Sequence, residues 1–376
     1  MDIRHHPLPA ASLGSQKTVT SLHFGTPGAR PKVYLQASLH AEELPGMLAA
    51  HHLRQELLAA ETAGQIRGEV VLVPVANPIG LAQRLDHKPM GRFEFSSSEN
   101  FNRHYPDLAQ VAFERTRGQL TLDGERNVAL VRAAVAGWLT EQRPETELQG
   151  LRHTLTSLAF DADVVIDLHC DCEAVMHFYT ERHCWPVLEP LSRYLGSQAV
   201  LLADAATNGG PFDEQLSGLW SQLTTLLRQA GDEAPLPVGC ASTTVELRGE
   251  ADVYHRLAEQ DSAALWAYLQ HLGAVEGPAP EVPPARCEPT PLAGSETLKA
   301  PCPGVLVFLA DVGQHLAVGD AVADIIDPTL GTVHTVRAGT AGVFYARILH
   351  RYIQTGLEIG KIAGSVPFRT GNLLGN

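Results

Sequence analysis

A histidine and a glutamate three residues apart, His40 and Glu43, follow a short, mostly apolar run that begins at Val33. The run is typical of a buried strand, and Pro45 after it is typical of a first helical turn, where its missing N–H costs nothing. We therefore expect both side chains at the carboxyl end of a strand, the edge where open α/β sheets bind ligands. An imidazole and a carboxylate at this spacing can reach one metal ion, and such sites suit zinc. On the spacing alone, the alternative is an ordinary helix start.

Two further strand ends carry side chains of the same kind. The buried run 162–168 is followed by His169, and Asp167 faces the same side of that strand, where it can hold the imidazole through its other nitrogen. The strand expected over residues 240–247 presents Glu246 near its end. A His/Glu/His set with an open fourth position is a catalytic zinc pattern, and a further carboxylate can take the proton of a bound water.

Each of these interpretations has an alternative. The histidines can be ordinary buried residues, and Glu246 can be paired with Arg248. Cys170 and Cys172 flank His169, but the other cysteines lack zinc-like spacing, so a cysteine-based zinc site ranks lower.

The elements that position these residues follow from hydrophobic periodicity. After an irregular lead-in over residues 1–30 with an edge strand at 17–23, the pattern alternates between buried strands and amphipathic helices. A long polar segment, 83–100, is expected to be a loop that is either functional or disordered. Asp123 is expected to cap a helix over 124–140. The other expected elements are strands at 33–39 and 68–76, helices near 47–60, 151–160, 185–195, 214–229 and 252–272, and a loop near 208–211.

The composition excludes several classes of protein. The chain has 376 residues, 44% hydrophobic and 19% charged, which is an ordinary globular balance with room for two domains. The net charge of −14 argues against nucleic acid as a partner but not against a small anion in a locally positive pocket. No signal peptide or transmembrane segment is expected, and the six cysteines form no disulfide framework, so we expect a cytoplasmic protein without membrane contacts.

A change in composition divides the chain. We expect a catalytic domain over residues 1–275, a stiff proline-rich linker over 276–298 and a β-rich domain over 299–376, where short apolar runs alternate with glycines. The expected fold class is α/β, with a mixed central sheet flanked by helices and followed by a small all-β domain.

The motifs, taken in order, resemble the succinylglutamate desuccinylase/aspartoacylase family, which has the zinc metallocarboxypeptidase fold. The resemblance covers about residues 30–270 and rests on the ordered set of motifs. Ala41-Glu42 stands where the family usually has Gly-Asn between the ligands, and the segments 107–126 and 170–184 match nothing. The matching motifs are His40-x-x-Glu43, Asn77-Pro78, Phe101-Asn102-Arg103, Asp167-Leu168-His169 and Thr244-Val245-Glu246.

The resemblance implies a role for each matched position. His40, Glu43 and His169 would bind one Zn²⁺ per chain, and Glu246 would be the general base. Asn102 and Arg103 would grip the free carboxylate of the substrate. An arginine that polarises the carbonyl lies shortly before this pair in the family. Arg92, which an aromatic residue follows, is the first choice here, and Arg84 is the second.

The segment from Lys299 onward resembles the barrel-sandwich fold of biotinyl and lipoyl carrier domains. A carrier presents a lysine at a hairpin tip, whereas the turn at 327–331 has none, so we expect no covalent cofactor. The module is expected to cover the mouth of the active site or to mediate assembly, and a homo-oligomer is left open.

The expected function is zinc-dependent hydrolysis of the amide bond of a small N-acyl amino acid or a similar acidic substrate. One alternative is a metallocarboxypeptidase-type peptidase that uses the same site. An alternative of another class is a non-catalytic binding protein that retains the zinc-peptidase shell.

Overall fold

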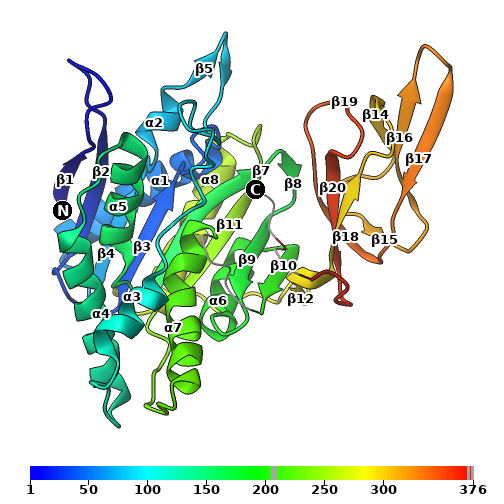
Figure 1. Ribbon diagram of the computed structural model, residues 1–376. Helices are drawn as coiled ribbons and strands as arrows, with labels where there is room; N and C mark the ends of the chain where they lie inside the picture. The colour runs from blue at the N-terminus through cyan, green and yellow to red at the C-terminus, as the bar shows by residue number, and fades with distance from the viewer. Residues whose placement is uncertain (205–209, 371–372, 374–376) are drawn as a thin grey trace.

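The computed structural model describes residues 1–204, 210–370 and 373, so part of the loop expected near 208–211 lies outside the described residues. The chain forms a large mixed α/β part followed by a smaller all-β part (Figure 1). The elements are β1 (Asp2–Pro7), β2 (Thr18–Gly25), β3 (Lys32–Ala37), α1 (Pro45–Thr62), β4 (Glu69–Val73), α2 (Pro78–Leu81), β5 (Arg84–Leu85), β6 (Lys88–Pro89), α3 (Leu108–Thr116), α4 (Gly124–Glu141), α5 (Glu147–Ala159), β7 (Val164–Asp171), β8 (Glu173–Ala174), β9 (His177–Glu181), α6 (Trp185–Leu195), β10 (Ala199–Ala203), α7 (Phe212–Gln229), β11 (Ala241–Gly249), α8 (His255–His271), β12 (Thr290–Pro291), the 3₁₀ helix η1 (Leu292–Gly294), β13 (Ser295–Lys299), β14 (Gly304–Phe308), β15 (His315–Leu316), β16 (Ala321–Asp327), β17 (Thr332–Arg337), β18 (Gly342–Arg347), β19 (Tyr352–Ile353) and β20 (Glu358–Gly364).

One mixed sheet forms the centre of the large part. Within the described residues it has nine strands in the order β1-β2-β4-β3-β7-β11-β9-β10-β12. The central strands β4, β3, β7 and β11 are parallel, whereas β2 and β9 run antiparallel to their neighbours β4 and β11. Every residue of β3 and β4 is buried because helices cover both faces, which explains their continuous apolar runs.

Two apolar cores hold the helices against the sheet. One core lies between one face and α1, α6 and α8, and the other between the opposite face and α3, α4, α5 and α7 (Figure 1). Asp123 caps α4 as expected, with its carboxylate accepting from the backbone N–H of Arg126 at 3.1 Å. The expected fold class is confirmed. The parallel strands end together at one edge of the sheet, which is the edge that carries the candidate site.

The smaller part is a pair of β-sheets around its own core. Within the described residues, one sheet has the order β13-β20-β18-β15 and the other β17-β16-β14-β19, with an apolar core between them. The short strand β8 of the large part pairs with β18, so this sheet contains residues from both parts of the chain. The division at residues 275 and 298 stays a prediction, and β12, inside the expected linker, pairs with β10 of the central sheet.

Some elements differ from the expectation. The lead-in is not irregular throughout, because β1 pairs with β2 along its whole length. This strand is polar and mostly exposed at the sheet edge, so it carries no apolar alternation. The helix α3 and the short strands β9 and β10 were also not expected. Part of the polar segment 83–100 is ordered as the hairpin β5–β6.

Candidate active site

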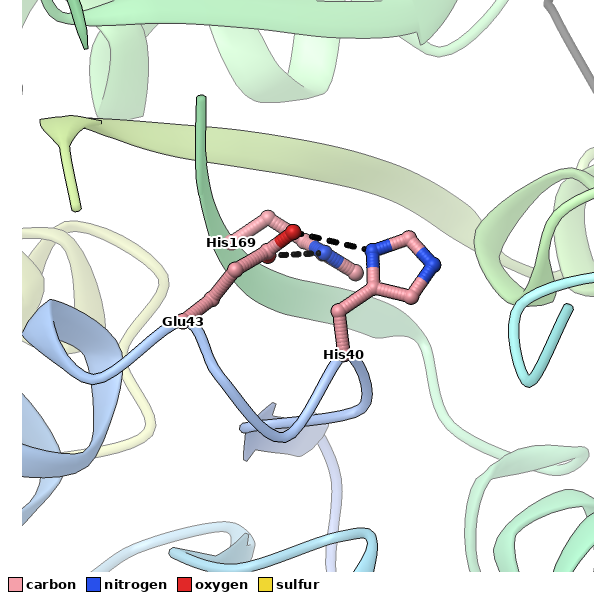
Figure 2. A group of neighbouring side chains, drawn as sticks. All are labelled: His40, Glu43 and His169. Atoms are coloured by element: carbon pink, nitrogen blue, oxygen red, sulfur yellow. Dashed lines mark hydrogen bonds and ion pairs between the residues drawn. The ribbon is translucent and has the colours of Figure 1, made fainter. Parts of the chain in front are cut away.

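His40 and Glu43 lie on a tight turn that follows β3. Ser38 has a φ of 64°, so the chain turns sharply just after the strand. The backbone N–H of Glu43 then donates to the carbonyl of His40 at 3.0 Å, and both side chains are 4% exposed. The turn places the imidazole and the carboxylate side by side over the end of the sheet (Figure 2).

His169 completes a buried triangle with these two residues. It lies near the end of β7, the strand beside β3, and is 2% exposed. Its Nδ1 is 2.7 Å from Oε2 of Glu43, and Nδ1 of His40 is 3.0 Å from Oε1 of the same carboxylate. Figure 2 shows dashed lines that join the one carboxylate to both imidazoles. The structure thus brings the three predicted residues together, and they form a group that can hold a metal ion.

The far nitrogen of His40 is held by a residue that the sequence analysis did not select. Nε2 of His40 is 2.8 Å from Oδ1 of Asn100, which also accepts the backbone N–H of Asn102 at 2.9 Å. Because Oδ1 can only accept, Nε2 of His40 must carry the proton. Nδ1 then carries the lone pair, which accepts from Nη1 of Arg92 at 3.3 Å in the metal-free site and is the atom that can bind a metal.

A row of buried polar side chains supports His169. Oδ2 of Asp167 is 3.0 Å from Nε2 of His169, an ion-pair distance, although neither atom makes an aligned hydrogen bond. Oδ1 of Asp167 accepts from Gln36 at 3.0 Å, and Gln36 accepts from the hydroxyl of Tyr34 at 2.8 Å. These contacts cross from β7 to β3 and fix Asp167 beside the imidazole, as the sequence pattern predicts.

The charges of the triangle fit a bound cation. Burial and Arg92 lower the pKa of His40 to about 4, so this ring is neutral and presents its lone pair to a carboxylate oxygen only 3.0 Å away. Burial alone would lower the pKa of His169, but Asp167 and Glu43 raise it well above its usual range. A proton on His169 therefore supplies positive charge to the metal-free site, and a metal ion among the three side chains would supply it instead.

Glu246 lies beside His169 on the neighbouring strand β11. The two residues are register partners, and the pairing becomes irregular directly after Glu246. Its Oε2 is buried and has no hydrogen-bond partner. Burial and the charge of Glu43 raise the pKa of Glu246 to about 8. A carboxyl group with an unpartnered oxygen and a raised pKa suits proton transfer near neutral pH.

The structure separates the two arginines considered for polarising a carbonyl. Nη1 of Arg92 is 3.3 Å from Oε1 of Glu43, and its side chain is 45% exposed, so it reaches the site from the solvent side. Gly91 fixes this arrangement: its N–H donates to Glu42, and a Cβ here would lie 2.6 Å from the backbone nitrogen of that residue. Arg84 lies instead on the exposed hairpin β5–β6.

Asn102 and Arg103 follow Asn100 on the same segment. Oδ1 of Asn102 accepts the backbone N–H of Phe212 at 2.7 Å, which leaves its NH₂ group as the donor. Arg103 is half-buried, and burial and the charge of Arg92 lower its pKa. Arg92 and Arg103 thus lie close enough for their positive charges to interact.

The C-terminal part reaches the neighbourhood of the triangle. Nζ of Lys361 on β20 is 2.8 Å from Oδ2 of Asp171, two residues after His169. Glu173 on β8 binds Arg347 and Arg351, each at 2.6 Å. These contacts place the C-terminal part close to the triangle, and whether it covers the mouth of the active site or mediates assembly stays a prediction.

Fold and site together define a class: an α/β protein with a mixed sheet, a buried His-Glu-His group at the ends of its parallel strands and an appended β-sheet part. The sequence profile of the succinylglutamate desuccinylase/aspartoacylase catalytic domain matches residues 29–125, which include His40, Glu43, Arg92, Asn102 and Arg103. The resemblance predicted from the motifs is confirmed.

Solved structures agree over nearly the whole chain. A protein from Shewanella amazonensis assigned to the same family is 25% identical, with a TM-score of 0.82 over 96% of this chain and 98% of that one. A similarly assigned protein from Shewanella frigidimarina is 24% identical, with a TM-score of 0.82 over 96% and 97%. The ectoine utilization protein EutE (DoeB) from Ruegeria pomeroyi shares the fold at 18% identity, with a TM-score of 0.66 over 96% and 95%. No curated protein matches the chain at a significant level.

The described part of the chain contains no helix long and apolar enough to cross a membrane.

Proposed function

We propose that the protein is a zinc-dependent hydrolase that cleaves the amide bond of a small N-acyl amino acid or a similar acidic substrate. The observation that carries the proposal is the buried triangle of His40, Glu43 and His169 beside the unpartnered carboxyl oxygen of Glu246. Two imidazoles and one carboxylate are the ligands of many catalytic zinc sites, which keep a fourth position for water or substrate. The similarity to the desuccinylase/aspartoacylase family supports the substrate class.

Zn²⁺ held by these three residues would supply the electrophile that polarises the amide carbonyl and makes a bound water acidic. Glu246 accepts the proton of the attacking water on its unpartnered Oε2 and later delivers it to the nitrogen of the leaving amine. Water thus adds its oxygen to the carbonyl carbon, the C–N bond breaks, and acid and amine are released. Asp167 and Asn100 keep the imidazoles oriented throughout.

The arginines provide the positive side of the site. Arg92 donates its guanidinium N–H groups to the oxygen that becomes negative in the transition state. Arg103 holds the carboxylate of the substrate in a two-pronged contact, and the NH₂ group of Asn102 adds a donor. Two arginines here also draw an anionic substrate to a chain whose net charge is −14.

The test is metal content and activity measured on the same preparations. Elemental analysis of wild type and His169→Ala should show that the variant binds one zinc ion fewer per chain. A panel of acetylated and succinylated amino acids, together with short peptides, should then be hydrolysed by wild type and not by His169→Ala. Peptides as the better substrates would favour the peptidase. A wild-type chain that neither contains zinc nor takes it up would overturn the proposal and favour a binding protein.

A further inference from the structure

Among the residues that the structure describes, a second group of side chains brings potential metal ligands together. Atoms of Glu181, His183 and Cys184 lie within 4.8 Å of one another. The three residues occupy the turn where β9 ends and α6 begins, and the backbone N–H of Cys184 donates to the carbonyl of Glu181 at 2.9 Å. Because β9 runs antiparallel to β11, this turn lies at the sheet edge opposite the one that carries His169 and Glu246.

The fold positions these side chains well. Glu181 is 1% exposed, and its carboxylate accepts from the hydroxyl groups of Ser217 and Ser221 on α7 at 2.5 and 3.3 Å. Cys184 is fully buried, and Ser217 also interacts with its thiol, so one serine links two members of the group. These contacts fix a carboxylate and a sulfur atom in positions that neither would hold as a free surface group.

His183 has a ring nitrogen without a hydrogen-bond partner, and its side chain is partly exposed to solvent. Its Nδ1 is 3.8 Å from Oε1 of Glu181, and its side chain is 25% exposed. Its Nε2 is buried without a hydrogen-bond partner. A buried imidazole nitrogen without a partner is costly, because its bond to water has been lost and not replaced. A metal ion bound by the ring would supply the missing partner and so remove this cost.

We propose that Glu181, His183 and Cys184 form a second metal site that takes a zinc-class divalent ion. The donor set is one thiolate, one imidazole and one carboxylate, which leaves a fourth tetrahedral position for water at the exposed side of His183. A sulfur ligand selects zinc-like ions over Mg²⁺ and Ca²⁺, which prefer sites made only of oxygen atoms. The ion would fix the turn between β9 and α6, whose Glu181 is already held by Ser217 and Ser221 of α7, and so act on stability rather than on the reaction.

Binding at this site must release a proton. Burial raises the pKa of the Cys184 thiol to about 12, so the thiol is neutral in the metal-free protein. The ion takes the thiolate, and the proton leaves to the buffer, so affinity should increase with pH.

Cobalt distinguishes this site from the one proposed for catalysis. The full chain is stripped with a chelator, loaded with Co²⁺, and its near-ultraviolet absorption is recorded. Thiolate bound to Co²⁺ gives an intense charge-transfer band there, whereas the two imidazoles and one carboxylate of the His40 group give none. The expected result is a band whose final intensity corresponds to one thiolate-bound Co²⁺ per chain. It should be equal in wild type, where the His40 group can take a second ion, and in His40→Ala, so the failure of the proposed function would leave this result unchanged.

Matched cysteine variants assign the band. Cys184→Ser and His183→Gln should each abolish it and reduce bound zinc by one ion per chain, whereas Cys170→Ser, a buried cysteine near Glu43, should retain it. The wild-type spectrum tests the proposal even if a variant fails to fold. A wild-type protein without the band, or a band that persists in Cys184→Ser, would overturn the second site.

Discussion

The stretch from His169 to Glu173 contributes to two neighbouring places that differ in how buried negative charge is balanced. At the candidate active site, Glu43 and Glu246 face two histidines, and burial together with the charge of Glu43 raises the pKa of Glu246. A few residues later, Asp171 and Glu173 bind cations of the C-terminal part: Lys361 for the first, and Arg347 and Arg351 for the second. The same stretch of chain thus contributes to one place in which a buried carboxylate raises the pKa of another, and to a second, compensated place in which each carboxylate is paired with a cation.

This difference distinguishes a site suited to binding a ligand from a contact that stabilises the packing of the two parts of the chain. Arg347 and Arg351 also lie over the ring of Phe308, at 4.8 and 4.9 Å from its centre, so their positions are fixed on two sides. In the triangle, by contrast, a neutral imidazole presents its lone pair to a carboxylate. Changes at the first place should therefore alter chemistry, and changes at the second should alter stability.

The largest effect is expected from Glu246→Gln. Glutamine has the same shape but cannot accept the proton of the attacking water, so kcat on the best substrate of the acyl-amino acid panel should fall about 10²- to 10⁴-fold. Bound zinc should stay unchanged, because Glu246 is not among the three ligand candidates. Steady-state kinetics and elemental analysis of the same samples measure both. A loss of less than about tenfold would show that another group moves the proton.

Asn100→Ala should weaken metal binding rather than the chemical step. The variant removes the acceptor that holds Nε2 of His40. Loss of such a supporting partner typically costs about 10- to 100-fold in metal affinity. Competition with a chelator measures that affinity, with Asn102→Ala as the neighbouring control that should raise KM instead. Equal metal affinity in wild type and Asn100→Ala would mean that Asn100 does not orient the ligand.

Glu173→Ala tests the compensated side of the comparison. Two arginines would lose their common carboxylate, and since all three side chains are partly exposed, the free energy of unfolding should fall by only about 1–2 kcal/mol. Denaturant unfolding measures the change. Glu358→Ala is the matched control, because its pair with Lys361 is longer, 3.4 Å, and more exposed. A large loss of kcat in folded Glu173→Ala would contradict the separation of the two places.

The sequence predicted one of these places well and the other poorly. His40, Glu43 and His169 follow nearly continuous apolar runs, and Glu246 lies near the end of an alternating one. Parallel strands bring such ends together, so pattern and topology agree. Asn100 lies directly before the Phe101-Asn102-Arg103 motif and was not selected, because nothing in the sequence shows that its amide faces His40 across 60 residues. The sequence also did not show whether Arg92 or Arg84 lies near Glu43. The packing of Gly91 against Glu42, which positions Arg92 there, is visible only in the structure.

The contacts between the two parts had no sequence signal. The pairing of β8 with β18 joins two-residue and six-residue segments far apart in the chain, and a two-residue strand has no periodicity to detect. Lys361 and Asp171 are 190 residues apart, and either residue alone reads as an ordinary surface charge. Long-range ion pairs of this kind depend on how two folded parts dock, which local pattern does not encode.

Lys361→Met is the smallest and most informative change, because Lys361 acts where the two places meet. The substitution leaves Asp171 without its closest cation and adds net negative charge near the site, where it should repel an anionic substrate. About 1 kcal/mol of repulsion, typical of a charge near a partly exposed site, corresponds to a KM roughly fivefold higher, with little change in kcat. Because salt screens such a charge, the difference in KM should shrink between low and high ionic strength.

Lys361→Arg, which keeps the charge, should behave like wild type. A KM that is unchanged, or raised equally at both ionic strengths, would show that the C-terminal part only holds the fold and does not contribute to the field around the substrate.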